Sequence, residues 1–131
     1  MDTFVTVAGN LTDDPELRFT TGTPVSNLRV AVTQRVLEHG AWRDGQTSFF
    51  RVNAWRENAA HLAGSLHKGD RVVVLGRLRQ RSWETPEGER RSVAEIEADE
   101  VAASLRWATA TIERVATGGA GESTRFGSPE G

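Results

Sequence analysis

The segment Arg71–Trp83, RVVVLGRLRQRSW, decides the fold class and points to the chemistry of this chain. Successive residues of a β-strand point to opposite faces, so the side chains at odd positions lie on one side of this strand. In its second half these are Arg77, Arg79, Arg81 and Trp83. The even positions that precede them hold valine, glycine and leucine. The pattern predicts a long strand with one face toward a core and an arginine-rich face toward solvent.

A second segment, Thr47–Trp55, divides its side chains in the same way. Its odd positions share one predicted face: Phe49, Arg51, Asn53 and Trp55. The even positions from 50 to 54 hold phenylalanine, valine and alanine, which are apolar as a barrel interior requires. Two separate strands therefore place large rings beside arginines on an outer face, which indicates a partner that covers the rings.

Outward from these two strands, strand and turn signals divide the rest of the chain. Glu57–Leu66 has apolar residues at helical spacing, and Lys68-Gly69 predicts its end. Asp44-Gly45 predicts a tight hairpin turn, which leaves Trp42 in a loop. Further strands are expected at Thr3–Gly9, Glu16–Thr20 (short), Val25–Arg35, Ser92–Val101 and Trp107–Val115.

The order of three strands, one helix and two strands predicts an all-β fold of the OB type. We expect a five-stranded Greek-key barrel with one helix between strands three and four, and an extra C-terminal strand. Residues 1–115 are expected to form this domain, and the Gly/Ser-rich residues 116–131 a flexible tail. Several other small β folds share the same order of elements.

Composition narrows the function classes. The 131 residues fit one domain, and the absence of cysteine excludes disulfides, thiol nucleophiles and thiolate metal sites. No long apolar run or signal peptide appears, so a cytoplasmic location is expected. The net charge is −2, but 15 of the 16 basic residues are arginine, the side chain best suited to phosphates and flat rings.

Single-stranded nucleic acid would cover the exposed rings. It offers one phosphate per nucleotide and unpaired bases, and each base–aromatic stack is worth about 1–3 kcal/mol. Duplex DNA hides its base faces, and every base has a π face, so we predict binding to single strands with little sequence preference. The alternatives are an ordinary solvated strand face for the arginines, and a core or subunit-interface position for Phe49, Trp55 and Trp83.

The order of several short motifs resembles the bacterial single-stranded DNA-binding proteins, over roughly residues 4–115. Residues 42–45 and 104–110 are similar to the actinobacterial branch. The motifs are Gly9-Asn10-Leu11, Asp14-Pro15-Glu16-Leu17-Arg18, Val25 with Leu28 and Ala31, Trp55-Arg56, Lys68-Gly69-Asp70-Arg71-Val72, and Gly76-Arg77-Leu78 running on to Arg81-Ser82-Trp83.

The resemblance implies an OB barrel that assembles as a homotetramer and wraps single-stranded DNA in replication, repair and recombination. It places base-stacking aromatics at Phe49, Trp55 and Trp83, and implies that the strand after Arg106 clamps neighbouring subunits. Together with the strand phasing, it gives the expected DNA-binding set: Arg35, Phe49, Arg51, Trp55, Arg56, Arg77, Arg79, Arg81 and Trp83.

Two departures from the family pattern stand out. Val36 occupies a position where relatives usually carry a further aromatic ring, so one stacking platform is expected to be missing. The chain closes with Ser128-Pro129-Glu130-Gly131 instead of the acidic tip that recruits replication and repair proteins. This puts such recruitment in doubt, and fits either a truncated chain or a specialised paralogue.

Catalysis is not expected. His39, His61 and His67 share no motif, and no phosphate-binding glycine loop or nucleophile motif appears, so no cofactor or metal is predicted. Acids alternate along residues 95–99, where they are expected to form a solvated strand face or to pair with nearby arginines rather than hold a cation. The competing functions are an OB-fold protein–protein adaptor, whose binding would depend only weakly on salt, and an RNA-binding protein of the cold-shock type.

Overall fold

The computed structural model of the chain describes residues 2–116. Within them, β-strands dominate and a single short helix interrupts the order, which confirms the predicted all-β class. The elements are β1 (Thr3–Leu11), β2 (Glu16–Thr20), β3 (Thr23–Glu38), β4 (Ala41–Trp55), α1 (Glu57–Ala63), β5 (Arg71–Glu84) and β6 (Arg90–Ala103).

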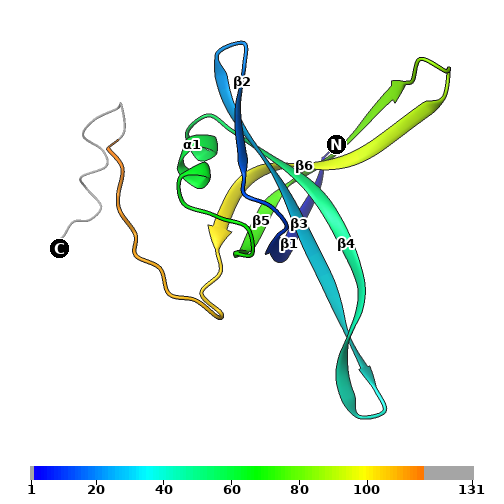
Figure 1. Cartoon of the computed structure of the whole chain (residues 1–131), viewed down its shortest axis with the longest axis vertical. Coiled ribbons are helices and arrows are strands. Elements are labelled where there is room, and N and C mark those ends of the chain that lie inside the picture. Colours follow the sequence, from blue (N-terminus) through cyan, green and yellow to red (C-terminus); the bar gives the residue numbers. More distant parts are fainter. Residues whose placement is uncertain (1, 117–131) are drawn as a thin grey trace.

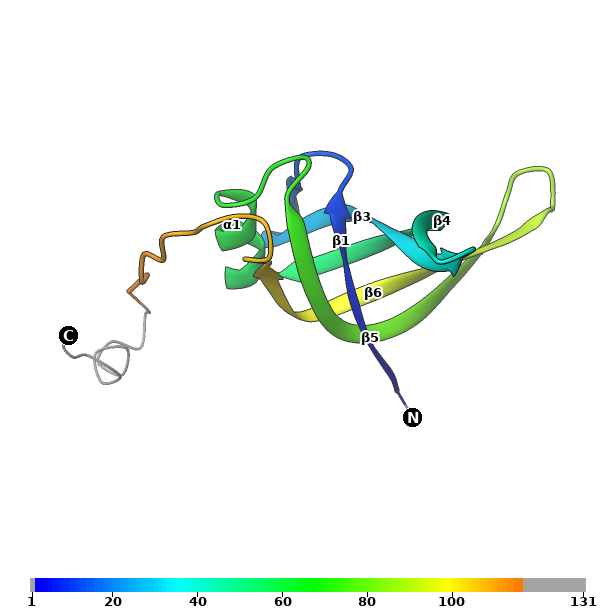
Figure 2. The same ribbon diagram turned by 90° about the horizontal axis from the view of Figure 1, so that it is seen from below.

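The strands form one sheet in the order β1-β5-β6-β4-β3-β2, which an additional β1–β3 pairing closes into a barrel (Figure 1). All pairings are antiparallel except the short parallel contact between β4 and β6. The five long strands and the helix between the third and fourth of them confirm the predicted OB barrel. Seen from below, α1 lies away from the protruding β3–β4 and β5–β6 hairpins (Figure 2).

The barrel interior is filled by the apolar faces that strand alternation predicts. The even positions of β5 and β4 face inward: Val72, Val74, Val52 and Ala54 have no exposed surface. The opposite walls contribute Val30 and Ile96, which are equally buried. Burial of this set on one side leaves the odd positions of both strands on the outside of the barrel.

Gly76 marks a bend in β5. A Cβ at this position would collide with the carbonyl oxygen of Glu97 on β6, so only glycine permits so close an approach of the two backbones. The pairing of β5 with β6 shifts register between Leu75 and Gly76, which is where a β-bulge bends a strand. The bend lets one continuous strand form part of the barrel and then one arm of the β5–β6 hairpin.

The β3–β4 hairpin turns at His39-Gly40, so the turn predicted at Asp44-Gly45 is wrong. Both turn residues have positive φ, 53° and 78°, as a tight hairpin turn requires. Asp44 lies inside β4 opposite Arg35, at 3.5 Å from its Nε, and the cross-strand ion pair helps to fix this register. Trp42 is correspondingly a strand residue opposite Leu37, and does not lie in a loop.

Two further boundaries differ from the expectation. The helix ends at Ala63 rather than near Leu66, because the Ser65 backbone N–H donates to the Leu62 carbonyl at 3.1 Å in a tighter turn, while the Ser65 hydroxyl donates to the His61 carbonyl at 2.7 Å. The seven-residue α1 is the only helix in residues 2–116, so that part of the chain contains no helix long and apolar enough to cross a membrane.

The strand expected at Trp107–Val115 is also absent, since residues 104–116 form no sheet pairing. A strand needs a sheet edge with free backbone groups, and this segment leaves the barrel instead of reaching one (Figure 1). Trp107 stacks against the guanidinium groups of Arg71 and Arg106, at 5.1 and 4.8 Å from the ring centre. The predicted flexible tail lies almost wholly outside the described residues.

Candidate nucleic-acid interface

An open cavity of about 600 Å³ lies on the outer face of the barrel. We call it the central groove and define it by the side chains that line it, of which four are arginines and four are acids: Asp13, Asp14, Glu16, Arg18, Asn27, Leu28, Arg29, Arg51, Asn53, Arg81 and Glu95. A smaller cavity of about 220 Å³ shares several of these residues and continues to Trp55. The groove thus joins a lining of arginines, acids and amides to one of the predicted stacking rings.

Strand register explains why these residues meet. Directly paired residues of neighbouring strands share a face, and Arg29 of β3 is paired with Arg51 of β4. Arg51 is in turn paired with Glu95 of β6, and Glu95 with Arg79 of β5. The odd-position face predicted separately for two strands is therefore one continuous surface across four.

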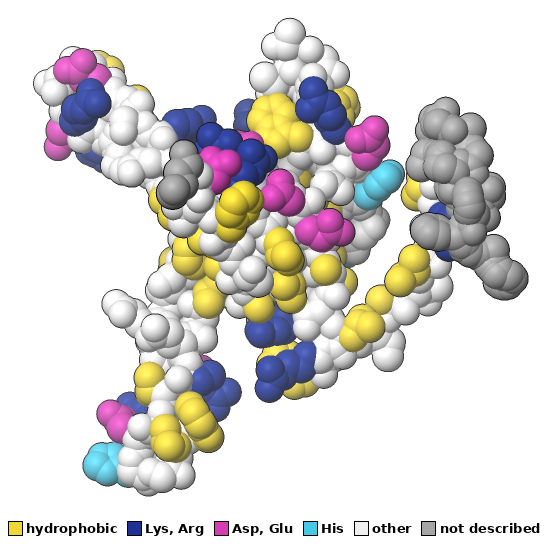
Figure 3. Space-filling model, turned by 180° about the vertical axis from the view of Figure 1, so that it is seen from behind, with side chains coloured by type: hydrophobic (Ala, Val, Ile, Leu, Met, Phe, Trp, Pro, Cys, Tyr) yellow, Lys and Arg dark blue, Asp and Glu magenta, His cyan; other side chains and the backbone are white. Residues whose placement is uncertain are grey.

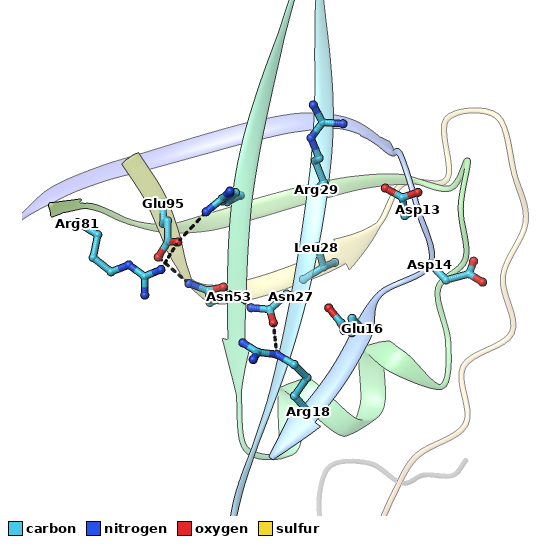
Figure 4. A pocket seen from close by; sticks show the side chains of 11 residues that line it. Asp13, Asp14, Glu16, Arg18, Asn27, Leu28, Arg29, Asn53, Arg81 and Glu95 are labelled. Carbon is cyan, nitrogen blue, oxygen red and sulfur yellow. Dashed lines mark hydrogen bonds and ion pairs between the residues drawn. The ribbon is translucent and has the colours of Figure 1, made fainter. Parts of the chain in front are cut away.

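A row of hydrogen bonds crosses the floor of the groove (Figure 4). Arg18 donates from Nε to Asn27 Oδ1 at 2.8 Å, and Asn27 donates from Nδ2 to Asn53 Oδ1 at 2.6 Å. Asn53 then donates from Nδ2 to Glu95 Oε1 at 3.1 Å. The row links β2, β3, β4 and β6, so it fixes the positions of the polar groups that a ligand in the groove would meet.

Carboxylates of β6 pair with the arginines. Glu95 Oε2 lies 3.5 Å from Arg81 Nη2 and 3.8 Å from Arg51 Nη1. Outside the groove, Asp99 lies 3.5 Å from Arg77 Nη2. The expectation that acids at 95–99 serve as partners for arginines is confirmed for these two. Both arginines on Glu95 remain mostly exposed, so they are accessible to a ligand.

The three predicted stacking rings are exposed rather than sealed in the core. Phe49, Trp55 and Trp83 expose 52%, 36% and 45% of their surfaces. Trp55 borders the groove, and Phe49 lies at its margin, where the Arg29 guanidinium stacks 4.1 Å from the ring centre. Trp83 lies farther away, opposite Arg91 on the β5–β6 hairpin. The core alternative is thereby wrong for all three.

The remaining predicted residues are dispersed. Arg79 is exposed on β5, without an ion pair in the described part of the chain, and Arg77 is half-buried against Asp99. Arg35 is engaged with Asp44 in the β3–β4 hairpin. Arg56 borders a separate pocket beside α1. The structure therefore gathers Arg51, Trp55 and Arg81 in one groove, places Phe49 at its margin, and leaves Arg35, Arg56 and Trp83 outside.

Sequence reasoning missed Arg18, Asn27 and Arg29 as groove residues, and it also missed the acids Asp13, Asp14 and Glu16. A signal existed for Arg29, because it lies on the polar face of a predicted strand. Nothing in the sequence showed that this face would continue the face of β4, which depends on register. Arg18 comes from a short strand assigned to a loop region, and only the β2–β3 pairing brings it to Asn27.

The charged face is mixed rather than uniformly basic. In Figure 3, dark blue and magenta side chains lie interspersed around yellow ones between the two protruding hairpins. Within residues 2–116, no group of three or more histidine, cysteine, aspartate or glutamate side chains is placed to hold a metal ion. The polar chemistry of this face is that of guanidinium, amide and carboxylate groups.

Proteins of known identity resemble this chain over most of its length. A single-stranded DNA-binding protein of Mycolicibacterium smegmatis is 53% identical over 121 residues, covering 90% of this chain and 73% of that protein. Its namesake in Mycobacterium bovis is 52% identical over 128 residues, covering 95% of this chain and 78% of the relative. Both organisms are actinobacteria, in agreement with the branch that the sequence motifs indicated.

The fold is also that of a solved relative. The crystal structure of the small single-stranded DNA-binding protein from Streptomyces coelicolor aligns with a TM-score of 0.72 and 38% identity, covering 80% of this chain and 96% of that one. The model of the Single-strand binding protein family matches residues 3–104, from the start of β1 to the residue after β6. The chain therefore belongs to the single-strand binding protein family.

Proposed function

We propose that this protein binds and protects single-stranded DNA with little sequence preference, in replication, repair or recombination. The observation that carries the proposal is the central groove, where arginines that phosphates can contact lie next to an exposed ring. The family membership supports the same function. No catalytic step is part of the proposal.

The groove suits a single strand for two physical reasons. Guanidinium groups form charge-assisted, bidentate hydrogen bonds with phosphate oxygens, and Arg51 and Arg81 are mostly exposed for this purpose. Trp55 and Phe49 offer faces on which unpaired bases can stack. A duplex keeps its bases stacked on each other, so it would gain the phosphate contacts without the ring contacts.

The DNA path is proposed to extend beyond the groove along both hairpins. Trp83 and Arg79 would receive the strand on β5, and Phe49 with Arg35 on the β3–β4 side. Arg56 would contact a strand that passes over the turn into α1. These assignments rest on exposure and on position along the outer face.

The assembly is proposed to be a homotetramer. Three apolar side chains of the C-terminal segment are strongly exposed in the single chain: Leu105, Trp107 and Ile112. Such exposure of large apolar groups favours a protein–protein contact that covers them. Native mass spectrometry should give four times the chain mass, and a monomer at micromolar concentration would contradict the proposal.

Tryptophan fluorescence titration with dT oligomers, at two salt concentrations and against a duplex control, tests the function. Stacking of bases on the indoles should quench fluorescence with the single strand and leave it nearly unchanged with the duplex. Affinity should fall steeply as salt rises, because phosphate contacts release counterions. Absent quenching, or binding indifferent to salt, would favour the OB-fold adaptor instead.

A further inference from the structure

Glu95 is a negative charge set into the floor of the central groove. Its side chain exposes only 10% of its surface, while the two arginines that contact it expose 59% and 68%. A buried carboxylate is costly unless it is paired and hydrogen-bonded. Here both conditions are met, so the charge is stable beneath a surface that must attract phosphates.

The same carboxylate oxygen holds both arginines. Arg51 approaches Glu95 Oε2 from β4 and Arg81 approaches it from β5, at 3.8 and 3.5 Å. The ion pairs bring together two strands that are not neighbours in the sheet. Two positive charges and one negative charge leave a single net positive charge among these three side chains, while Asp13, Asp14 and Glu16 add negative charge elsewhere in the groove lining.

The other oxygen is fixed by the hydrogen-bond row. Asn53 donates to Glu95 Oε1, and Asn53 is itself held by Asn27, which is held by Arg18. Arginine only donates and a carboxylate only accepts, so the row fixes the orientation of both amides between them. Glu95 is therefore prevented from turning away when a ligand enters, and its charge stays in the groove (Figure 4).

Resting on the proposed function, we propose that Glu95 is a positioning residue that weakens the grip on single-stranded DNA: it holds Arg51 and Arg81 in place and competes with phosphate for them. Only one of the two guanidinium groups is then available for a net phosphate contact. The cost in affinity keeps the bound strand releasable, while the geometry of the groove is preset before DNA arrives.

Glu95→Gln tests the competition, because glutamine retains the oxygen that accepts from Asn53 and removes the charge. For single strands, each phosphate neutralised contributes about 0.7 to the slope of log affinity against log salt. The variant should gain one such contact, so its slope should steepen by about 0.7. When salt is lowered from about 1 M to about 0.05 M, the affinity of the variant should therefore rise roughly eightfold more than that of the wild type. Circular dichroism and thermal melting verify that it is folded.

Glu100→Gln is the matched control. It changes the net charge equally on the same strand, and Glu100 is exposed without an ion pair among the described residues. Its slope should stay near that of the wild type. If both variants steepen the slope equally, the effect is one of overall charge. If neither changes it, there is no competition with phosphate. Either result would overturn the proposal.

Arginine labelling of the wild-type protein with phenylglyoxal, read by mass spectrometry, tests the proposal without a variant. Arg79 should react faster than Arg51 and Arg81, because their guanidinium groups are held against the carboxylate. Equal rates would overturn the proposal, even if Glu95→Gln fails to fold. A wild-type chain that does not bind dT oligomers would refute the proposed function instead, and the labelling order would still decide the role of Glu95.

Discussion

Trp55 lies at the end of β4, where the central groove meets the turn into α1. With 36% of its surface exposed, it can accept a base without leaving its position. We expect Trp55→Ala to weaken dT oligomer binding by about 1–3 kcal/mol, the usual value of one base–aromatic stack. Quenching of the remaining tryptophans, or fluorescence anisotropy of a labelled oligomer, measures the affinity.

Trp55→Phe is the matched variant, since it keeps a flat ring and should retain most of the affinity. Thermal melting of both variants shows whether the barrel is intact. If Trp55→Ala binds as tightly as the wild type while remaining folded, the ring does not stack on DNA and the groove must be reassigned.

Arg56 has an unusual backbone for a residue with a side chain, at φ 60° and ψ −130°. This region suits glycine, and other residues held there store about 1–3 kcal/mol of strain. Arg56→Gly should therefore stabilise the protein by about 1 kcal/mol, after the greater flexibility of glycine in the unfolded chain is subtracted. Chemical denaturation measures this change.

Glu57→Gly, one residue farther along, provides the contrast. Glu57 has an ordinary helical backbone in the first turn of α1, so glycine there should destabilise by about 1 kcal/mol. Destabilisation by both substitutions would mean that the backbone of Arg56 is not strained.

At the scale of elements, the bend in β5 is a feature on which the barrel depends. Gly76→Ala would place a methyl group against the carbonyl oxygen of Glu97 and the Cα of Ala98, and neither backbone atom can move without breaking the β5–β6 ladder. We expect a loss of about 3 kcal/mol or more, or failure to fold. Urea denaturation followed by circular dichroism measures it.

Gly64→Ala is a suitable control for the same chemical change. Gly64 follows α1 with a right-handed backbone, and an added Cβ would meet its nearest neighbour at 3.6 Å, an ordinary contact. Its stability should differ little from that of the wild type. A mild effect at Gly76 comparable with that at Gly64 would show that β5 and β6 can separate locally.

Over the whole molecule, the net charge is a poor guide to the binding of single-stranded DNA, and the distribution of the charges is a better one. The net charge of the chain is −2, yet Glu95 and Asp99 form ion pairs with arginines on the outer face of the barrel, and further arginines line that face. Replacing Arg77, Arg79 and Arg81 together by glutamine should make the salt slope shallower by about 1–2, because each phosphate contact is worth about 0.7. Titrations of dT oligomers across a salt series give the slope.

Lysine at the same three positions is the control, since it keeps the positive charge and lacks the planar guanidinium group that makes bidentate contacts with phosphate. Its slope should remain close to that of the wild type, with some loss of affinity. An unaltered slope in the glutamine variant would show that these arginines do not contact phosphates.

The amino-acid sequence by itself determined the fold class and the faces of the strands. Alternation in 47–55 and 71–83 separates apolar from arginine and ring positions, because successive side chains of a strand must point to opposite sides. The exposure of Phe49, Trp55 and Trp83 follows from that local rule. The helix was located by a second local rule, the spacing of apolar residues along a helical face, which gave its start but not its end at Ala63.

Tertiary structure alone decided which of these residues meet. The pairing of Arg29 with Arg51, and of Arg51 with Glu95, depends on register between strands distant in sequence, which local patterns do not specify. The same holds for the His39-Gly40 turn, which the β3–β4 register decides, and for residues 104–116, which form no strand because no sheet edge pairs with them. Glu95 looked like one acid in an alternating row, and only the closed barrel places it beneath two arginines from different strands.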